Sequence, residues 1–177
     1  MKLSKALTLF LVLASAPAAA SDPADQVYGL IDARLELMQP VAAWKHDQGV
    51  AVEDKAREAV VLEKAVEAAV AQGIEPAGAE AFFRQQIEAA KEIQFCWLAR
   101  WEEGAATPPA QVPDLKTEIR PQLIAIGAEL LRSTKDSLAT QAPFALTPFQ
   151  ASVEVECLST ETRDGLFQAL SAMQLAP

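Results

Sequence analysis

The sequence predicts an all-α fold, a single domain of six helices. Apolar residues recur at alternating intervals of three and four in long segments, as they do in helices with one face in a core. Glycine or proline stands at most of the breaks between these segments. A lone short segment alternates like a strand, but it would have no partner strand.

The N-terminus has the features of a secretory signal. Lys2 and Lys5 precede an apolar run over residues 6–14, and three alanines at 18–20 supply the small residues that a signal peptidase needs. The run is too short to span a bilayer. We therefore expect cleavage near Ala20, a signal peptide over residues 1–20, a helical domain over residues 21–177, and a periplasmic or secreted protein.

The chain is acidic, with a formal net charge of −9, or −11 after loss of residues 1–20. Phosphate backbones and anionic lipids both require a basic face, so we expect neither a nucleic-acid partner nor a membrane partner. An anionic substrate would be repelled at long range and could bind only where basic groups cluster.

The two cysteines and the single histidine limit the other chemistry. A Cys96–Cys157 bond would close a loop of about 60 residues and contribute roughly 4 kcal/mol, but two buried free thiols remain possible. His46 lies near a predicted helix end, where we expect it to be solvated. No spacing of ligand residues suggests a metal site.

The first two helices are predicted over residues 25–48 and 54–71. The first has a stripe spaced 4, 3, 4, 3, 4, formed by Val27, Ile31, Arg34, Met38, Val41 and Lys45. Pro40 should kink this helix without ending it, and Gly49 should end it. Asp54 can cap the second helix, which Gly73 stops.

The third helix is predicted from Pro76 to residue 103, with Gly104 as its end. Its stripe has the same spacing and contains Phe83, Ile87, Ala90, Gln94, Trp97 and Trp101. A loop over residues 105–113 follows.

The remaining helices are less regular. The fourth runs from Asp114 or Thr117 to residue 139, with Pro121 disturbing its first turn. Residues 147–150 read as a capping box that opens a fifth helix, and the alternating segment 152–157 is assigned to helix. A last helix spans residues 160–173.

Charged residues in apolar stripes carry the functional information. Arg34 and Lys45 are about three turns apart on one face of the first helix, and burying two cations is costly unless anions meet them. Each residue alone could instead reach solvent or pair with a glutamate. Asp54 and Arg57 can pair in one helical turn, beside Glu58, although a solvated helix start explains them equally well.

Gln94 adds a buried amide that must find hydrogen-bond partners, either in a neighbouring helix or in a ligand. Short connections would pack the three helices that carry these groups side by side. Together these groups predict one pocket for a small dicarboxylate. They are the two arginines, Lys45, Asp54 and Gln94.

These residues resemble chorismate mutases of the all-helical AroQ type. The resemblance lies in the run from Pro40 to Lys45, the preceding Arg34 and the following residues 53–58, and it is specific over residues 31–94. The signal peptide, residues 83–90 and the long C-terminal extension are similar to the secreted gamma subclass. The resemblance is weaker over residues 114–131 and absent as a motif beyond them.

The resemblance implies rearrangement of chorismate to prephenate without a cofactor or a covalent intermediate. Arg34 and Arg57 would bind the two carboxylates, while Lys45 and Gln94 would donate to the ether oxygen. Glu58 would accept a hydrogen bond from the ring hydroxyl, and Asp54 would support the site. Arg120 would supply a further cation from the same chain. A homodimer is also implied.

Two positions depart from the family's pattern. Ala90 stands where relatives have a serine or threonine that contacts a carboxylate, so this hydrogen bond should be missing or replaced. Pro121 directly follows Arg120 and could change how that helix begins. The alternative function is a non-catalytic periplasmic binding or adaptor protein on the same helical scaffold.

Overall fold

The protein is all-helical. The computed structural model describes residues 22–140 and 143–177, so the expected signal peptide and its cleavage site lie outside the described residues. Its helical segments are α1 (Pro23–Glu36), α2 (Met38–Gln48), α3 (Lys55–Ala71), α4 (Pro76–Glu102), η1 (Leu115–Ile119), α5 (Arg120–Leu138), α6 (Leu146–Ser152) and α7 (Thr160–Ser171). These are the six expected helices, because α1 with α2 and η1 with α5 each form one expected helix in two parts.

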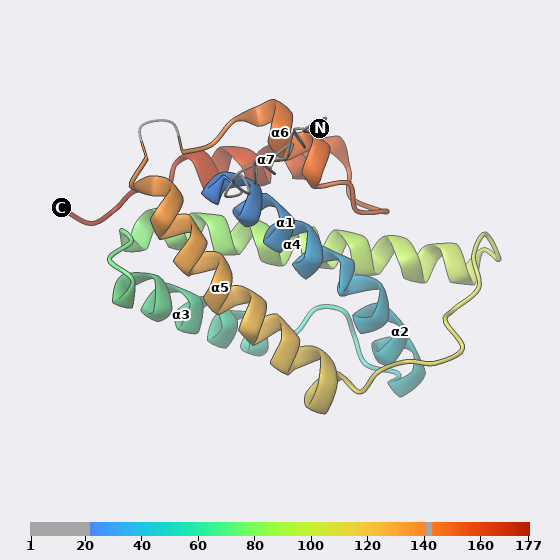
Figure 1. Ribbon diagram of the computed structural model, residues 1–177. Coiled ribbons are helices and arrows are strands. Elements are labelled where there is room, and N and C mark those ends of the chain that lie inside the picture. The colour runs from blue at the N-terminus through green and yellow to red at the C-terminus, as the bar shows by residue number, and fades with distance from the viewer. Residues whose placement is uncertain (1–21, 141–142) are drawn as a thin grey trace, which may run out of the picture.

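The long helix α4 is the centre of the arrangement (Figure 1). Helices α2, α3 and α7 pack against it, while α1 packs mainly against α5. The core between them is apolar and includes the fully buried side chains of Tyr28, Phe82, Ile93, Phe149 and Leu170. Within the described residues, no helix combines the length and apolar character needed to cross a membrane.

The first expected helix is broken at Leu37, so the expectation that Pro40 only kinks it was wrong in degree. Helix α1 ends at Glu36 and α2 begins at Met38. Proline at position 40 has no N–H to donate to the carbonyl of Glu36, and its ring crowds that carbonyl. The axis can therefore change direction there, and Arg34 and Lys45 lie on separate helices that still face one pocket.

A wide helical turn absorbs Pro121 at the start of α5. Residues Leu115–Ile119 form a π-helical turn in which the N–H of Arg120 bonds to the carbonyl of Leu115. Pro121 then occupies the first turn of α5, where a missing N–H costs little. Asp114 caps this turn by accepting from the N–H groups of Lys116 and Thr117, at 2.9 and 2.8 Å.

The C-terminal region differs from two expectations. Helix α6 begins at Leu146 after an extended Ala145 that makes no side-chain cap, so the capping box predicted at Thr147 does not form. Residues 153–157 are neither helix nor strand. Val153 and Val155 are buried in this segment, and that burial alone produces the alternating pattern.

A disulfide ties this segment to α4. Cys96 and Cys157 are bonded, which resolves the alternatives that the sequence left open in favour of the bridge. Nearby, Arg100 lies over the ring of Trp97 and pairs with Glu156 at 2.5 Å. His46 is exposed, as expected, with an accessible fraction of 54% for its side chain.

Candidate active site

A cavity of about 420 Å³ lies between α3, α4 and α5, and residues of α1 and α2 also contribute to its wall. It is lined by all eight residues that the sequence singled out: Arg34, Lys45, Asp54, Arg57, Glu58, Ala90, Gln94 and Arg120. The structure therefore brings the residues that the sequence singled out together in one cavity.

The cavity is strongly cationic although the chain is acidic. Six cationic side chains line it against two acidic ones, with the cations being Arg34, Lys45, Arg57, Lys64, Lys91 and Arg120. The rest of the wall is largely apolar, including Val41, Phe83 and Ile87. A low-dielectric wall strengthens the field of these cations, so the cavity is suited to a small anionic ligand with an apolar body.

Arg34 is fixed in the wall of the cavity. Its side chain is half-buried, and Nη1 donates to the carbonyl oxygen of Leu123 on α5 at 3.2 Å. Burial lowers the pKa of the Arg34 guanidinium below its ordinary value. An anionic group that binds it would therefore offset the cost of its desolvation.

Lys45 is oriented by the segment that precedes α3. Its Nζ donates to the carbonyl oxygen of Val52 at 2.6 Å. Burial lowers the pKa of Lys45, while the charges of Asp54 and Glu58 oppose this effect and that of Arg120 adds to it. The ammonium is thus held in place with donor capacity left for a ligand.

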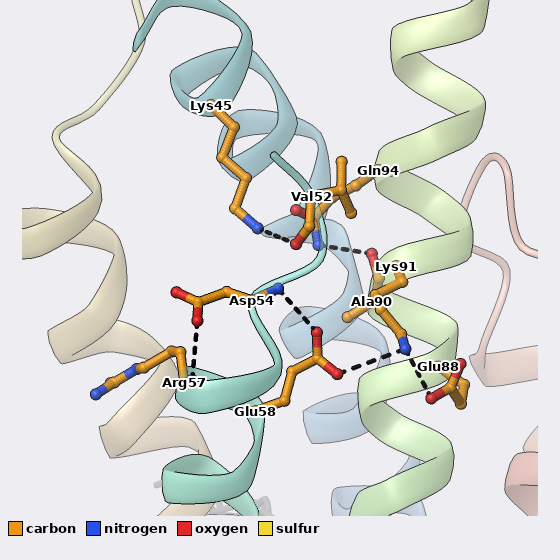
Figure 2. A network of polar contacts seen from close by, with 9 residues as sticks. All are labelled: Lys45, Val52, Asp54, Arg57, Glu58, Glu88, Ala90, Lys91 and Gln94. Atoms are coloured by element: carbon orange, nitrogen blue, oxygen red, sulfur yellow. Dashed lines mark hydrogen bonds and ion pairs between the residues drawn. The ribbon is translucent and has the colours of Figure 1, made fainter. Parts of the chain in front are cut away.

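The start of α3 places three of the predicted residues. Asp54 caps the helix by accepting from the backbone N–H of Arg57 at 3.0 Å, and its own N–H donates to Glu58 Oε1 at 3.1 Å. The expected pairing of the Asp54 carboxylate with the Arg57 guanidinium is not present among the described contacts. Capping occupies that carboxylate instead, and the Arg57 side chain extends away from the network (Figure 2).

Gln94 is buried opposite Lys45, and the two side chains point toward each other from α4 and α2 (Figure 2). Gln94 Nε2 donates to the carbonyl oxygen of Ala90 at 2.8 Å, while Oε1 is buried without a partner in the described structure. Ala90 itself contributes only a methyl group to the wall.

Arg120 reaches the same cavity from the junction of η1 and α5. Its positive charge contributes to the lowered pKa of Lys45. The proline that follows does not remove Arg120 from the site, because the π-helical turn accommodates it.

Lys91 also lines the cavity, although no pattern in the sequence marks it as a site residue. It pairs with Glu58 across the interface of α3 and α4 and with Glu88 on its own helix. The i, i+3 spacing of Glu88 and Lys91 is a common surface pattern, so the sequence carried no signal for its place in the pocket.

Comparison with known sequences identifies relatives for most of the chain. The family described as chorismate mutase type II matches residues 24–95. A secreted chorismate mutase of Mycolicibacterium smegmatis is 32% identical over 75% of this chain and 72% of its own length. A monofunctional chorismate mutase of Enterobacter agglomerans is 31% identical over 81% of this chain and 80% of its own length.

Solved structures show the same architecture. The secreted chorismate mutase of Yersinia pestis superimposes with a TM-score of 0.79 over 85% of this chain and 97% of its own, at 24% identity, which supports the fold. The chorismate mutase of Burkholderia thailandensis superimposes with a TM-score of 0.69 over 85% of this chain and 98% of its own, at 30% identity. The shared sequence and the shared helical fold lead to one conclusion: this chain belongs to the chorismate mutase family.

Proposed function

We propose that the cationic cavity is the site at which this chain, an isomerase of the chorismate mutase family, rearranges chorismate to prephenate. One observation carries the assignment of the site: six cations and a buried amide line one cavity in a chain with a net charge of −9. Family membership decides against the non-catalytic binding or adaptor protein that composition alone allowed.

Arg34 and Arg57 are the proposed clamps for the two carboxylates of the substrate. A planar guanidinium can donate two parallel hydrogen bonds to a carboxylate, and each charge-assisted bond contributes roughly 1.5–3 kcal/mol. Holding both carboxylates forces the substrate into a compact conformation, in which the carbons that form the new bond are close. Arg120 supplies a further cation to the cavity that Lys45 also lines.

Lys45 and Gln94 are the proposed catalytic donors. The ether oxygen of chorismate gains negative charge as its C–O bond breaks, so fixed donors stabilise the transition state more than the bound substrate. Removing one such donor costs about 3–4 kcal/mol of barrier, so the pair could supply most of the roughly 8 kcal/mol of a modest enzyme. Nε2 of Gln94 donates one N–H to the Ala90 carbonyl and has a second N–H, near Met38 Sδ at 3.8 Å, that could serve in this way.

The remaining groups hold and complete the site. Glu58 would accept a hydrogen bond from the ring hydroxyl, and Asp54 would support this arrangement by capping α3. Ala90 would border the substrate without bonding to it, which leaves one carboxylate with fewer donors. No cofactor is needed, because the rearrangement is a single concerted step.

We further propose export and dimerisation. The secreted relatives and the N-terminal sequence support a periplasmic or extracellular location, with cleavage near Ala20. The proposed assembly is a homodimer, as the resemblance implies. Each chain would hold a complete cavity, because Arg120 and Arg34 line the same cavity within one chain.

Incubation of the purified protein with chorismate tests the proposal directly. Loss of the diene absorbance of chorismate, with prephenate as the product, is the expected result. Gln94→Ala should abolish turnover while the helical circular-dichroism signal remains. Absence of turnover above the uncatalysed rate would reject the proposal.

A further inference from the structure

We propose that Lys91 is a positioning residue of this site, whose ammonium holds Glu58 in the orientation that accepts from the substrate. This inference rests on the proposed function, because it states how one group of that cavity is held. Lys91 is not proposed to touch the reacting atoms.

The surroundings of Lys91 are unusual for a lysine. Its side chain is only 15% exposed, and it lines the cavity beside Ala90 on α4. Its Nζ lies 2.8 Å from Glu88 Oε1 and 3.5 Å from Glu58 Oε2 (Figure 2). The hydrogen bond to Glu88, followed by the charges of Glu88 and Glu58, raises the pKa of Lys91, so the ammonium stays charged.

Glu58 is consequently held from two sides. Oε1 accepts from the backbone N–H of Asp54 at 3.1 Å, and Oε2 faces the ammonium of Lys91. The lone pairs that remain have a fixed direction at the wall of the cavity. A fixed acceptor loses little rotamer freedom when the ligand binds, so more of the hydrogen-bond energy appears as affinity.

A second cap in the same chain separates the contribution of Lys91 from that of helix capping. At the start of η1, the N–H of Asp114 donates to Glu118 Oε1 at 2.9 Å, with the same i, i+4 spacing as Asp54 and Glu58. Glu118 has no cation within ion-pair distance among the described residues, and it does not line the cavity. Capping therefore needs only one carboxylate oxygen, and the ion pair on the other is particular to the glutamate at the cavity.

The charge of Lys91 also matters to a dianionic ligand. An unpaired Glu58 would repel the substrate carboxylates within a low-dielectric wall. Pairing with Lys91 offsets that repulsion while leaving Glu58 able to accept. The other reading is a structural brace that merely joins α3 to α4, and the experiment must distinguish the two.

A double-mutant cycle makes that distinction. Lys91→Met and Glu58→Gln are each expected to lower kcat/KM about tenfold, and the double variant should be no worse than Glu58→Gln alone. The loss should appear in KM with kcat nearly unchanged, because the hydroxyl contact is present in both the bound substrate and the transition state. Lys91→Arg, which keeps the charge, should recover activity to within about threefold of the unsubstituted protein.

The matched control is Arg84→Met. Arg84 is on the same helix, pairs with Glu80 at 2.6 Å and lies outside the cavity. The Arg84→Met variant loses a cation and an ion pair from α4, as Lys91→Met does, but away from the cavity. Its kcat and KM should therefore not change. Circular dichroism monitors folding, and Lys91→Gln provides a second uncharged variant that should reproduce the loss if Lys91→Met does not fold.

The outcomes separate this inference from the proposed function. If the unsubstituted protein does not rearrange chorismate, the proposed function fails. If that protein is active but the Lys91 and Glu58 losses multiply in the double variant, only the inference is overturned. Failure of Lys91→Arg to exceed Lys91→Met would overturn it as well.

Discussion

Lys45 Nζ and the carbonyl oxygen of Val52 lie 2.6 Å apart, so the end of α2 and the segment before α3 together fix the direction of the ammonium. Substitution of Lys45 by methionine keeps the length of the side chain and removes the donor. We expect kcat/KM to fall about 10²–10³-fold, as it does when other enzymes lose one preorganised donor. Steady-state kinetics measures this loss, and Lys116→Met on the exposed face of η1 is the control that should leave kinetics unchanged.

The amide of Gln94 predicts a flat response to pH on the acidic side. An amide donates whatever the pH, whereas a carboxyl group in its place donates only when protonated. The activity should therefore not decline between about pH 5 and pH 8, the range in which a raised carboxyl would titrate. Gln94→Glu should introduce a decline as the pH rises through that range. A steep decline in the unsubstituted protein would contradict the assignment of Gln94 as the neutral donor.

On the alkaline side, Lys45 should set the limit. Burial lowers its pKa, so the donor ammonium is lost at a lower pH than the ordinary lysine value of about 10.4. The lowered pKa of Lys45 affects stability in the opposite direction from activity as the pH rises. Between the folded and unfolded pKa values the folded state binds fewer protons, so this group's contribution to the free energy of unfolding rises with pH. A pH–rate profile and urea titrations at several pH values measure the two effects.

A mixing experiment tests whether each chain holds a complete site. Arg34→Ala and Arg120→Ala should each be nearly inactive, since both side chains line one cavity within a chain. When the two variants are unfolded and refolded together, no hybrid assembly should contain an intact site. Activity that reappears in the mixture would show that Arg120 acts in a partner chain.

The disulfide should contribute to stability without taking part in the chemistry. Replacing both Cys96 and Cys157 by serine removes the cross-link between α4 and the segment before α7. The free energy of unfolding should fall by about 4 kcal/mol on the chain-entropy model. Gln94 and Cys96 are two residues apart on α4 and therefore do not share a face of the helix. The position of Gln94 and the activity of the folded variant should be unaffected. Urea titration with and without reductant measures the effect, and reductant should change only the unsubstituted protein.

The helices were predictable because their core faces are long and regular, and the ends marked by Gly49 and Pro76 were predictable as well. The break inside the first expected helix was not. The break at Leu37 depended on how far a chain can bend at Pro40, which spacing does not encode. Likewise, the alternation of Val153 and Val155 reflects burial of an irregular segment, and a period of two cannot distinguish that from a strand.

The site was predictable where a polar residue interrupts an apolar stripe. Arg34, Lys45 and Gln94 stand out in this way, and all three line the cavity. Lys91 does not, because its importance comes from Glu58, a residue on another helix and 33 positions away. Contacts of that kind depend on tertiary packing, so the sequence alone could not reveal them.

The two proposed clamps differ in how firmly they are held. Arg34 is half-buried and bonded to Leu123, whereas the guanidinium of Arg57 is exposed and has no partner among the described residues. A ligand would thus meet one guanidinium that a hydrogen bond already orients and another that only the ligand would orient. The contact with Arg57 should break first on release, so substitutions of Arg57 should act first on residence time and those of Arg34 on whether the ligand docks at all.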